Sequence, residues 1–313
     1  WGTLEMEDCV VSNNRAAGDG GGLLNRGMAT LIGDPPNIMI GSAVGMSFND
    51  FLLNTAPITP VIMLFIMLFI YFVWGRRLKT TEEARQRVMR FRERDAIRDV
   101  RLLKQSMFVL ALVMTGFVFA HALNLEPATI AMFGAGLLLL LTNIGSSPED
   151  QSEDVHKSFA EVEWVTIFFF VGLFILVSGI EHVGILEMLG DWVIELTGGD
   201  MAVTAIAILW VSAVTSAVVD NIPFVATMIP LIESMATTFG GAENLMPIWW
   251  SLALGACLGG NGSLVGASAN LIVAGFAERA GQRIGFLPFM LMAFPLMLLS
   301  ILIATIYVYL RYL

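Results

Sequence analysis

The sequence predicts an all-α polytopic membrane protein with a re-entrant hairpin and broken membrane helices. Of its 313 residues, 56% are hydrophobic and 14% are charged, whereas soluble domains carry about 25% charged residues. Long uncharged runs, such as residues 57–74, approach the roughly 20 apolar residues that cross a bilayer as a helix. Three stretches rich in Gly, Pro, Asn and Asp then interrupt the apolar pattern. Together these observations define the expected fold.

Five apolar segments are long enough to predict full membrane spans. They cover roughly residues 56–75, 105–123, 127–143, 164–181 and 286–310. Shorter apolar pieces lie between residues 200 and 280. There we expect hairpin arms and half-helices.

The basic residues are concentrated in one loop, which predicts the orientation. Residues 75–104 hold 11 of the 17 Lys and Arg residues, and such loops stay on the cytoplasmic side. We expect a basic cytoplasmic loop over residues 76–104, an acidic cytoplasmic loop over 144–163 and an outer interfacial helix over 181–199. With a net charge of −10 and no second basic cluster, nucleic acid is not an expected partner. The two cysteines lie outside any CxxC pair and predict neither a disulfide framework nor a zinc site.

One of the three stretches places an acid and an amide between two apolar segments. Residues 201–219 and 224–235 are apolar, and Asp220-Asn221-Ile222-Pro223 separates them. Pro223 lacks a backbone N–H and disfavours helical geometry in the residue before it. We expect a re-entrant hairpin over residues 200–237, with Asp220 and Asn221 at a tip inside the membrane.

The other two interruptions resemble each other. The segment GMATLIGDPPNI at residues 27–38 aligns with GNGSLVGASANL at residues 260–271, and one full apolar span follows each copy. The pattern indicates an internal repeat. It also predicts a helix over residues 247–281 that is broken at mid-membrane, because its two apolar pieces are too short to cross alone. The matched pairs are Gly27 with Gly260, Thr30 with Ser263, Leu31 with Leu264, Gly33 with Gly266 and Asn37 with Asn270.

Backbone groups at a break in a membrane helix must face protein or a wet cavity, because lipid cannot hydrogen-bond them. Paired breaks mark the midplane site of many transporters: half-helix N-termini attract anions, and carbonyls, hydroxyls and amides bind Na⁺. Within such a site, Asp220, Asn221, Asn261 and Ser263 form a candidate Na⁺ site. The full predicted set is Thr30, Gly33, Asp34, Asn37, Asp220, Asn221, Gly260, Asn261, Ser263, Gly266 and Asn270.

Asp34 and Asp220 are the two acids expected at membrane depth, where a charged side chain costs at least ~2.5–3.5 kcal/mol. Either could bind Na⁺ or carry a coupling proton. The alternatives are a helix cap for Asp34, which precedes Pro-Pro, and a water-exposed tip for Asp220. Cys257 is either a small buried hydrophobe or a soft ligand for a species such as As(III). No cofactor is expected beyond the coupling ion, Na⁺ or H⁺.

Three motifs resemble a known transporter family. The segments GMATLIGDPPNIMIGSA, SAVVDNIPFVATMIPL and LGACLGGNGSLVGASANLIVAGFAE are similar to the ArsB/NhaD-type branch of the ion-transporter superfamily. That branch includes arsenite/antimonite permeases, NhaD-type Na⁺/H⁺ antiporters and the melanosomal P protein, and the resemblance covers residues 27–313. It implies a homodimeric secondary transporter in the lipid bilayer, with two inverted repeats and an elevator-like shift of its transport domain. The hairpin tip would be Asp220-Asn221, and the breaks would lie at residues 33–37 and 260–270.

The resemblance implies an inverted-repeat transporter whose first repeat is incomplete. Residues 27–75 would be the tail of the first repeat. Residues 105–313 would be the second, with scaffold spans, the hairpin 200–237, the broken helix 247–281 and the last span 286–310. Residues 1–26 instead resemble one turn of an outer-membrane β-helix repeat, which indicates a chimaeric join near Gly27. We therefore expect that this chain does not transport alone.

The predicted function is secondary transport of a small inorganic ion by alternating access, in a bacterial inner membrane or its equivalent. The ion would be arsenite or antimonite, or Na⁺ exchanged for H⁺. No Lys or Arg lies at the breaks, so a multiply charged anion would have to rely on the dipoles of the half-helices. A dicarboxylate or other anion symporter is therefore the second choice, followed by a non-transporting membrane fragment. No enzyme activity is expected. An intramembrane aspartyl protease would need Asp34 and Asp220 to share one water.

Overall fold

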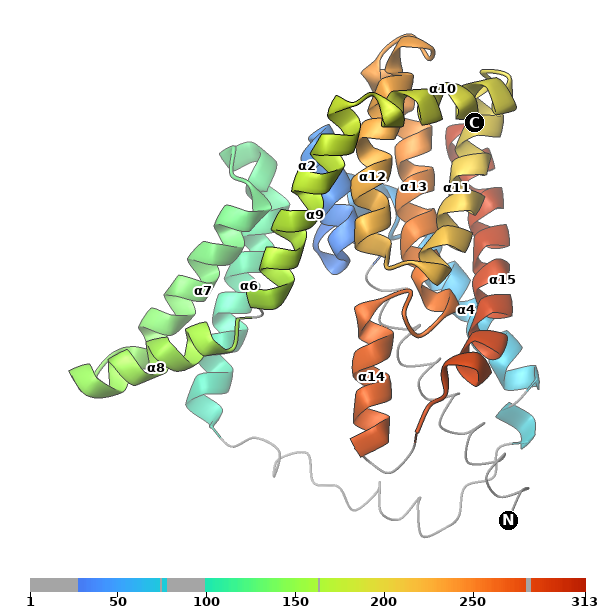
Figure 1. Ribbon diagram of the computed structural model, residues 1–313. Coiled ribbons are helices and arrows are strands. Elements are labelled where there is room, and N and C mark those ends of the chain that lie inside the picture. The colour runs from blue at the N-terminus through green and yellow to red at the C-terminus, as the bar shows by residue number, and fades with distance from the viewer. Residues whose placement is uncertain (1–27, 74, 78–98, 163, 280–282) are drawn as a thin grey trace. The chain divides into compact units, whose positions relative to one another are not determined.

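The computed structural model describes residues 28–73, 75–77, 99–162, 164–279 and 283–313, and these contain helices and no strand (Figure 1). The all-α prediction is confirmed. The proposed β-helix turn of residues 1–26 and most of the basic loop lie outside the described residues. The chain divides into two compact units, Trp1–Arg76 with Gly172–Leu313, and Arg77–Val171. Each unit is described by itself.

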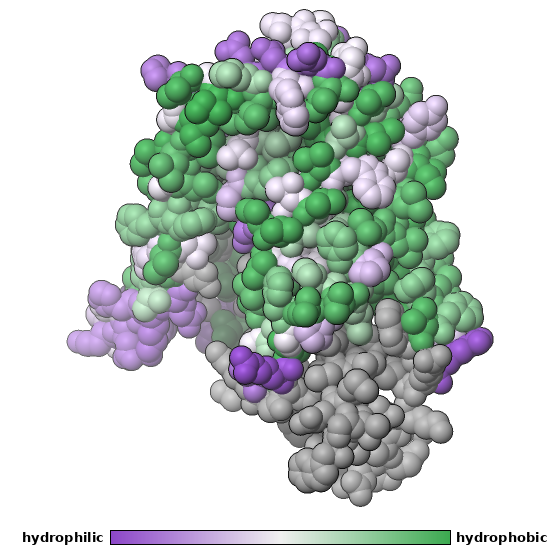
Figure 2. Space-filling model, turned by 45° about the vertical axis from the view of Figure 1, so that its right-hand side comes forward, coloured by the Kyte–Doolittle hydropathy of each residue, from purple (hydrophilic) through white to green (hydrophobic). Residues whose placement is uncertain are grey.

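Four helices of the described chain are long and apolar enough to cross a membrane. They are α6 (Val100–Leu123), α9 (Trp164–His182), α11 (Met201–Val218) and α15 (Phe286–Tyr312). A fifth span is possible if α3 (Phe48–Asn54) and α4 (Ile58–Val73), bent by 47° at their junction, count as one. The segment expected to span at 127–143 forms α7 (Pro127–Asn143), which is apolar but only 17 residues long. Figure 2 shows hydrophobic side chains covering the helices, with hydrophilic residues gathered near their ends.

The unit Arg77–Val171 is built on a pair of packed helices. The α6 helix ends at Asn124, whose left-handed backbone (φ 50°) turns the chain before Pro127 begins α7. The Gln105 side-chain amide donates to the Leu141 carbonyl across the pair, at 2.9 Å. Within the acidic segment 144–163, residues Pro148–Ala160 form the helix α8. Ser147 caps its N-terminus and two acids occupy its first turn, where they favour a helix.

The core of the other unit is the contact between α11 and α13 (Met246–Gly259). The sequence Gly255-Ala-Cys-Leu-Gly259 is a GxxxG pattern, which lets membrane helices approach closely. A Cβ atom built on Gly255 would lie 2.5 Å from the Leu209 carbonyl oxygen, and one on Gly259 would lie 2.4 Å from that of Ala213. The Ser216 hydroxyl donates across the same contact to the Ala256 carbonyl at 2.7 Å. Small residues thus bring the two backbones into contact.

The last helix, α15, closes this core and holds α3 at its C-terminal end. The Tyr307 hydroxyl donates to the Asn54 carbonyl at 2.6 Å, and the Arg311 guanidinium donates to the Leu53 carbonyl at 3.0 Å. Carbonyls at a helix C-terminus lack partners within the helix and carry negative charge, so a cation and a hydroxyl stabilise them.

The remaining elements of this unit are short. The α10 helix (Ile185–Thr197) lies within residues 181–199, where an interfacial helix was predicted. It contacts α11 and α12 (Asn221–Ser234) and lies across their ends (Figure 1). Its Met188, Trp192 and Leu196 are exposed on one face, as in a helix at a membrane surface. The others are η1 (Leu31–Gly33), α2 (Pro35–Val44), η2 (Gly75–Arg77), η4 (Met235–Thr237), η5 (Ala242–Leu245), η6 (Gly260–Gly262) and α14 (Ser268–Arg279).

The close contact of α11 and α13 predicts a sharp response to one added methyl group. We expect Gly259→Ala to lower the free energy of unfolding by about 1–3 kcal/mol, because the new Cβ overlaps the Ala213 carbonyl. The control is Gly179→Ala in α9, where nothing lies within 4 Å of the new Cβ and helix propensity predicts no loss. Thermal unfolding in detergent measures both. Equal melting temperatures for the two variants would contradict the packing argument.

Candidate functional site

The first interruption is a helix start inside the protein. Thr30 and Asp34 have extended backbones on either side of the short turn η1, and α2 begins at Pro35. Proline suits the first turn of a helix, because its fixed φ is helical and its missing N–H would have no partner there. The Asp34 and Asn37 side chains are both buried. A helix thus begins at Pro35, within the break predicted at residues 33–37, and the chain before Met28, where the other half of a broken helix would lie, is outside the described residues.

The two repeated motifs fold in the same way. The Asn37 side-chain amide donates to the Thr30 carbonyl at 3.1 Å, and the Asn270 amide donates to the Ser263 carbonyl at 2.9 Å. Each asparagine therefore binds the carbonyl seven residues earlier, at matched positions of the repeat. Their backbone N–H groups also match, since Asn37 donates to Asp34 at 3.0 Å and Asn270 to Ala267 at 3.1 Å. The repeat seen in the sequence is thus also a repeat of local structure.

The second interruption joins α13 to α14 through η6 and an extended segment. The Ser263 hydroxyl accepts the Gly266 N–H at 3.1 Å, and the Asn270 amide reaches a second carbonyl, that of Gly260, at 3.0 Å. Gly260 and Gly266 approach each other closely, because a Cβ on either would lie 2.8 Å from the carbonyl oxygen of the other. Asn261 lies within η6 and is half-buried. The polar groups of this loop are largely directed at one another.

The turn between α11 and α12, where the hairpin tip was predicted, meets the start of α2. The α11 helix ends at Val218 and α12 begins at Asn221, with Asp220 as its N-cap. The Asn221 side-chain amide faces both oxygens of the Asp34 carboxylate, at 3.3 and 3.5 Å. Asp34 is 5% exposed and Asn221 is 3% exposed. The structure therefore brings together two predicted site residues that are far apart in the sequence.

The two acids have different roles from those the sequence alternatives gave them. Asp34 was considered as a helix cap, yet its side chain makes no capping hydrogen bond to α2. Asp220 instead caps its own helix, because its Oδ1 accepts the Ile222 N–H at 3.0 Å. Asp34 is therefore the buried carboxylate that faces another element, and Asp220 is the half-buried cap beside it.

Cys257 joins this cluster, although it was not among the predicted site residues. Its thiol donates to Asn37 Oδ1 at 3.3 Å, from the fully buried interior of α13. The Asn37 amide is thus engaged at both ends, by the thiol and by the Thr30 carbonyl. The signal available in the sequence was position, since Cys257 lies one turn before the second break.

The assembled cluster consists of Asp34, Asn37, Asn221 and Cys257, from α2, α12 and α13. The N-termini of α2 and α12 both lie at it, and helix N-termini favour negative charge. It offers carboxylate and amide oxygens, which are ligands for hard cations such as Na⁺ or sites for a proton. Ser263 and Asn270 bind within their own loop. In the described part of the chain, no three His, Cys, Asp or Glu residues gather as a metal site.

Buried polar clusters at interrupted helices define a class, the multi-pass membrane proteins that handle ions or polar solutes within the bilayer. The comparisons agree with that class. The model of the citrate transporter family (CitMHS) matches residues 22–255. The chain therefore belongs to this family of the ion-transporter superfamily, and it is an integral multi-pass membrane protein.

Relatives support the same assignment. An uncharacterized transporter of Mycobacterium tuberculosis is 39% identical over 286 residues, which cover 91% of this chain and 64% of the relative. A 46 kDa membrane protein of Mycobacterium leprae is 36% identical over 287 residues, with 92% and 65% covered. The P protein of Sus scrofa is 36% identical over 228 residues, with 70% and 26% covered. The chain thus spans less than two thirds of the first of these proteins, and the superfamily resemblance read from the motifs is confirmed.

The two hydrogen bonds from the Asn270 side chain to earlier carbonyls predict that this amide contributes strongly to stability. We expect Asn270→Ala to destabilise the protein by about 1–3 kcal/mol, because the buried carbonyls of Gly260 and Ser263 lose their donor. Asn244→Ala is the control. The Asn244 amide donates to a single carbonyl, that of Phe239, and this hydrogen bond is exposed. Thermal unfolding and proteolysis near residues 260–270 report the effect. A loss no larger than that of the control would remove the asparagine from this role.

Proposed function

We propose that the chain contains the ion-binding centre of a secondary active transporter that works by alternating access, with Asp34 and Asn221 holding the coupling cation, Na⁺ or H⁺. The observation that carries the proposal is the buried Asp34 carboxylate, which has the Asn221 amide and the Cys257 thiol as its neighbours and no cationic side chain among them. An ionised carboxylate is costly at membrane depth unless a cation, a proton or strong donors compensate it. A site that gains and loses a cation meets that requirement.

Two cargo classes follow from different observations. The site has acid, amide and thiol groups and no basic side chain among its hydrogen-bonded members, which favours a small inorganic ion: arsenite or antimonite, or Na⁺ in exchange for H⁺. The family description favours a carboxylate anion such as citrate. The N-termini of α2 and α12 could receive part of its charge, with the coupling cation supplying the rest. We rank the inorganic ion first and the carboxylate second, and we propose a homodimer as the working state.

A catalytic role for the two acids is not part of the proposal. A shared water between two carboxylates requires both to be available. Asp220 Oδ1 is bound to the Ile222 N–H of its own helix, and Asp34 faces Asn221. The transporter family of the chain also favours a permease.

The coupling cation can be tested by binding alone. We expect Na⁺, compared with choline at equal ionic strength, to raise the melting temperature of the purified chain, because a ligand of the folded state stabilises it by RT ln(1 + [L]/Kd). Asp34→Asn should abolish the increase, while Asp191→Asn on the exposed surface of α10 should retain it. If Na⁺ has no effect, a melting temperature that depends on pH in the wild type and not in Asp34→Asn supports H⁺. The same ion response in wild type and Asp34→Asn would exclude Asp34.

The cargo requires flux measurements in proteoliposomes. Uptake of labelled citrate and of arsenite, each with and without a Na⁺ or H⁺ gradient, separates the two classes. If the chain does support uptake, contrary to the expectation from its sequence, Asp34→Asn should abolish the gradient-driven uptake of the true cargo. Asp220→Asn should reduce it less, because Asp220 acts mainly on its own helix. Robust uptake by this chain would contradict the expectation that it cannot transport alone. Unchanged uptake by Asp34→Asn would contradict the proposed coupling.

A further inference from the structure

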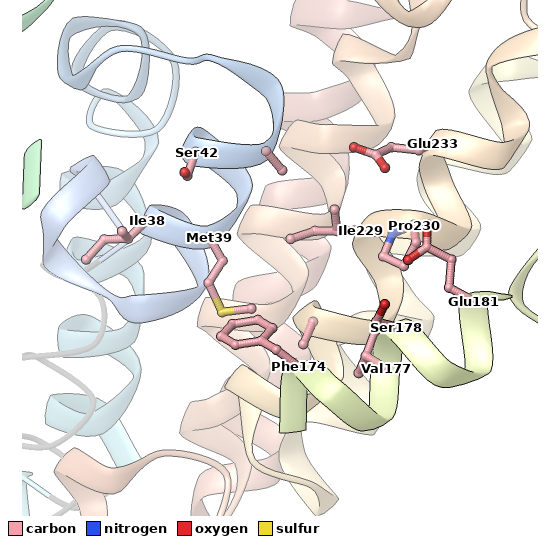
Figure 3. A pocket seen from close by; sticks show the side chains of 12 residues that line it. Ile38, Met39, Ser42, Phe174, Val177, Ser178, Glu181, Ile229, Pro230 and Glu233 are labelled. Carbon is pink, nitrogen blue, oxygen red and sulfur yellow. The ribbon is translucent and has the colours of Figure 1, made fainter. Parts of the chain in front are cut away.

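A cavity of about 550 Å³ lies apart from the polar cluster, between α2, α12 and the part of α9 that belongs to the same unit (Figure 3). None of the residues that line it belongs to the cluster of Asp34, Asn37, Asn221 and Cys257. Its volume is in the range of about 300–1,000 Å³ that holds a small organic ligand. It is therefore a separate candidate site.

The walls of the cavity are mostly apolar. Met39 of α2, Phe174 of α9 and Ile229 of α12 contribute large apolar side chains, and Pro230 adds a rigid surface. Pro230 lies within α12, so it also removes one backbone N–H from the cavity side of the helix. The hydroxyls of Ser42 and Ser178 are the neutral polar groups of the lining. A ligand that fits these walls needs a substantial apolar body.

Two carboxylates, those of Glu181 and Glu233, belong to the same lining. Glu181 comes from the end of α9 and Glu233 from the end of α12, and Figure 3 shows the two side chains on the same side of the cavity, across from α2. No Lys or Arg lines the cavity, and within the described part of the chain neither glutamate forms an ion pair. Both glutamates are exposed residues. Two like charges on one cavity repel each other, and one positive charge placed between them relieves that repulsion.

These features favour one kind of ligand. A hard metal ion needs six or more oxygen ligands, or retains its water, and the apolar walls supply neither. An anion would be repelled by both carboxylates, and a plain acyl chain would gain nothing from them. A cation with its charge spread over an apolar body suits the carboxylates, and the Phe174 ring can also attract it through its face.

We propose that this cavity binds a lipophilic monovalent cation, of the class of hydrophobic amines, quaternary ammonium ions and phosphonium ions. The charge lies near Glu181 and Glu233, and the apolar body lies against Met39, Phe174 and Ile229. The site is independent of the proposed ion-binding centre, because the two share no residue.

Tetraphenylphosphonium and tetraphenylborate test the proposal, because they share one shape and carry opposite charges. We expect the purified chain, in an uncharged detergent, to bind labelled tetraphenylphosphonium saturably with one site per chain, and tetraphenylborate only in proportion to the detergent. Glu181→Gln and Glu233→Gln should each raise the Kd for tetraphenylphosphonium about threefold to fivefold, the range of a partly solvated ion pair. The double variant should raise it further. Glu195→Gln, an exposed acid of α10, is the matched control and should leave the Kd unchanged.

A second variant tests the cavity rather than its charge. Ala43→Trp places a large ring from α2 into the cavity with both carboxylates intact, and it should abolish saturable binding. The Na⁺ or pH response of the melting temperature, which reports the Asp34 site, serves as the folding control for all variants. Equal binding of the two tetraphenyl ions, or unchanged binding by the double glutamine variant or by Ala43→Trp, would overturn the proposal. None of these results bears on the coupling role of Asp34.

Discussion

The arrangement of this membrane protein depends on how it satisfies backbone groups where two helices are interrupted. Lipid offers no hydrogen bonds, so carbonyls exposed at a break must find donors within the protein. Asn37 and Asn270 are those donors, each reaching back seven residues to the carbonyl of a hydroxyl residue. Asparagine suits this role because its short side chain carries a two-hydrogen donor that can bind two carbonyls at once. Asn270 does so, with Gly260 and Ser263.

Once the breaks are closed in this way, the N-termini of α2 and α12 are left at one buried position. Their N–H groups and dipoles favour negative charge, and Asp34 supplies it with the Asn221 amide opposite. The two copies of the repeat differ at this point, since Ala267 occupies the position that matches Asp34. The buried carboxylate therefore belongs to one copy of the repeat only, and the other copy has no acid at the matching position.

Sequence reasoning located the interruptions well, because Gly, Pro and Asn act on the backbone locally. The start of α2 at Pro35 and the start of α12 at Asn221 are of this kind. The distinct roles of the two acids could not be predicted, because the Asp34 partner lies 187 residues away in the chain. Cys257 was missed for the same reason, since its bond to Asn37 depends on how α13 packs against α2. The start of α8, by contrast, has a local signal, Ser147 before Pro148.

The hydrogen bonds also limit which parts can move together. Asn221 ties α12 to α2 through Asp34, and Cys257 ties α13 to α2 through Asn37. In turn, α13 is held to α11 by a glycine contact that leaves no space for a methyl group, and by the bond from Ser216. Densely packed contacts of this kind have discrete arrangements and deform little. The helices α2, α11, α12 and α13 are therefore joined into one packed body around Asp34.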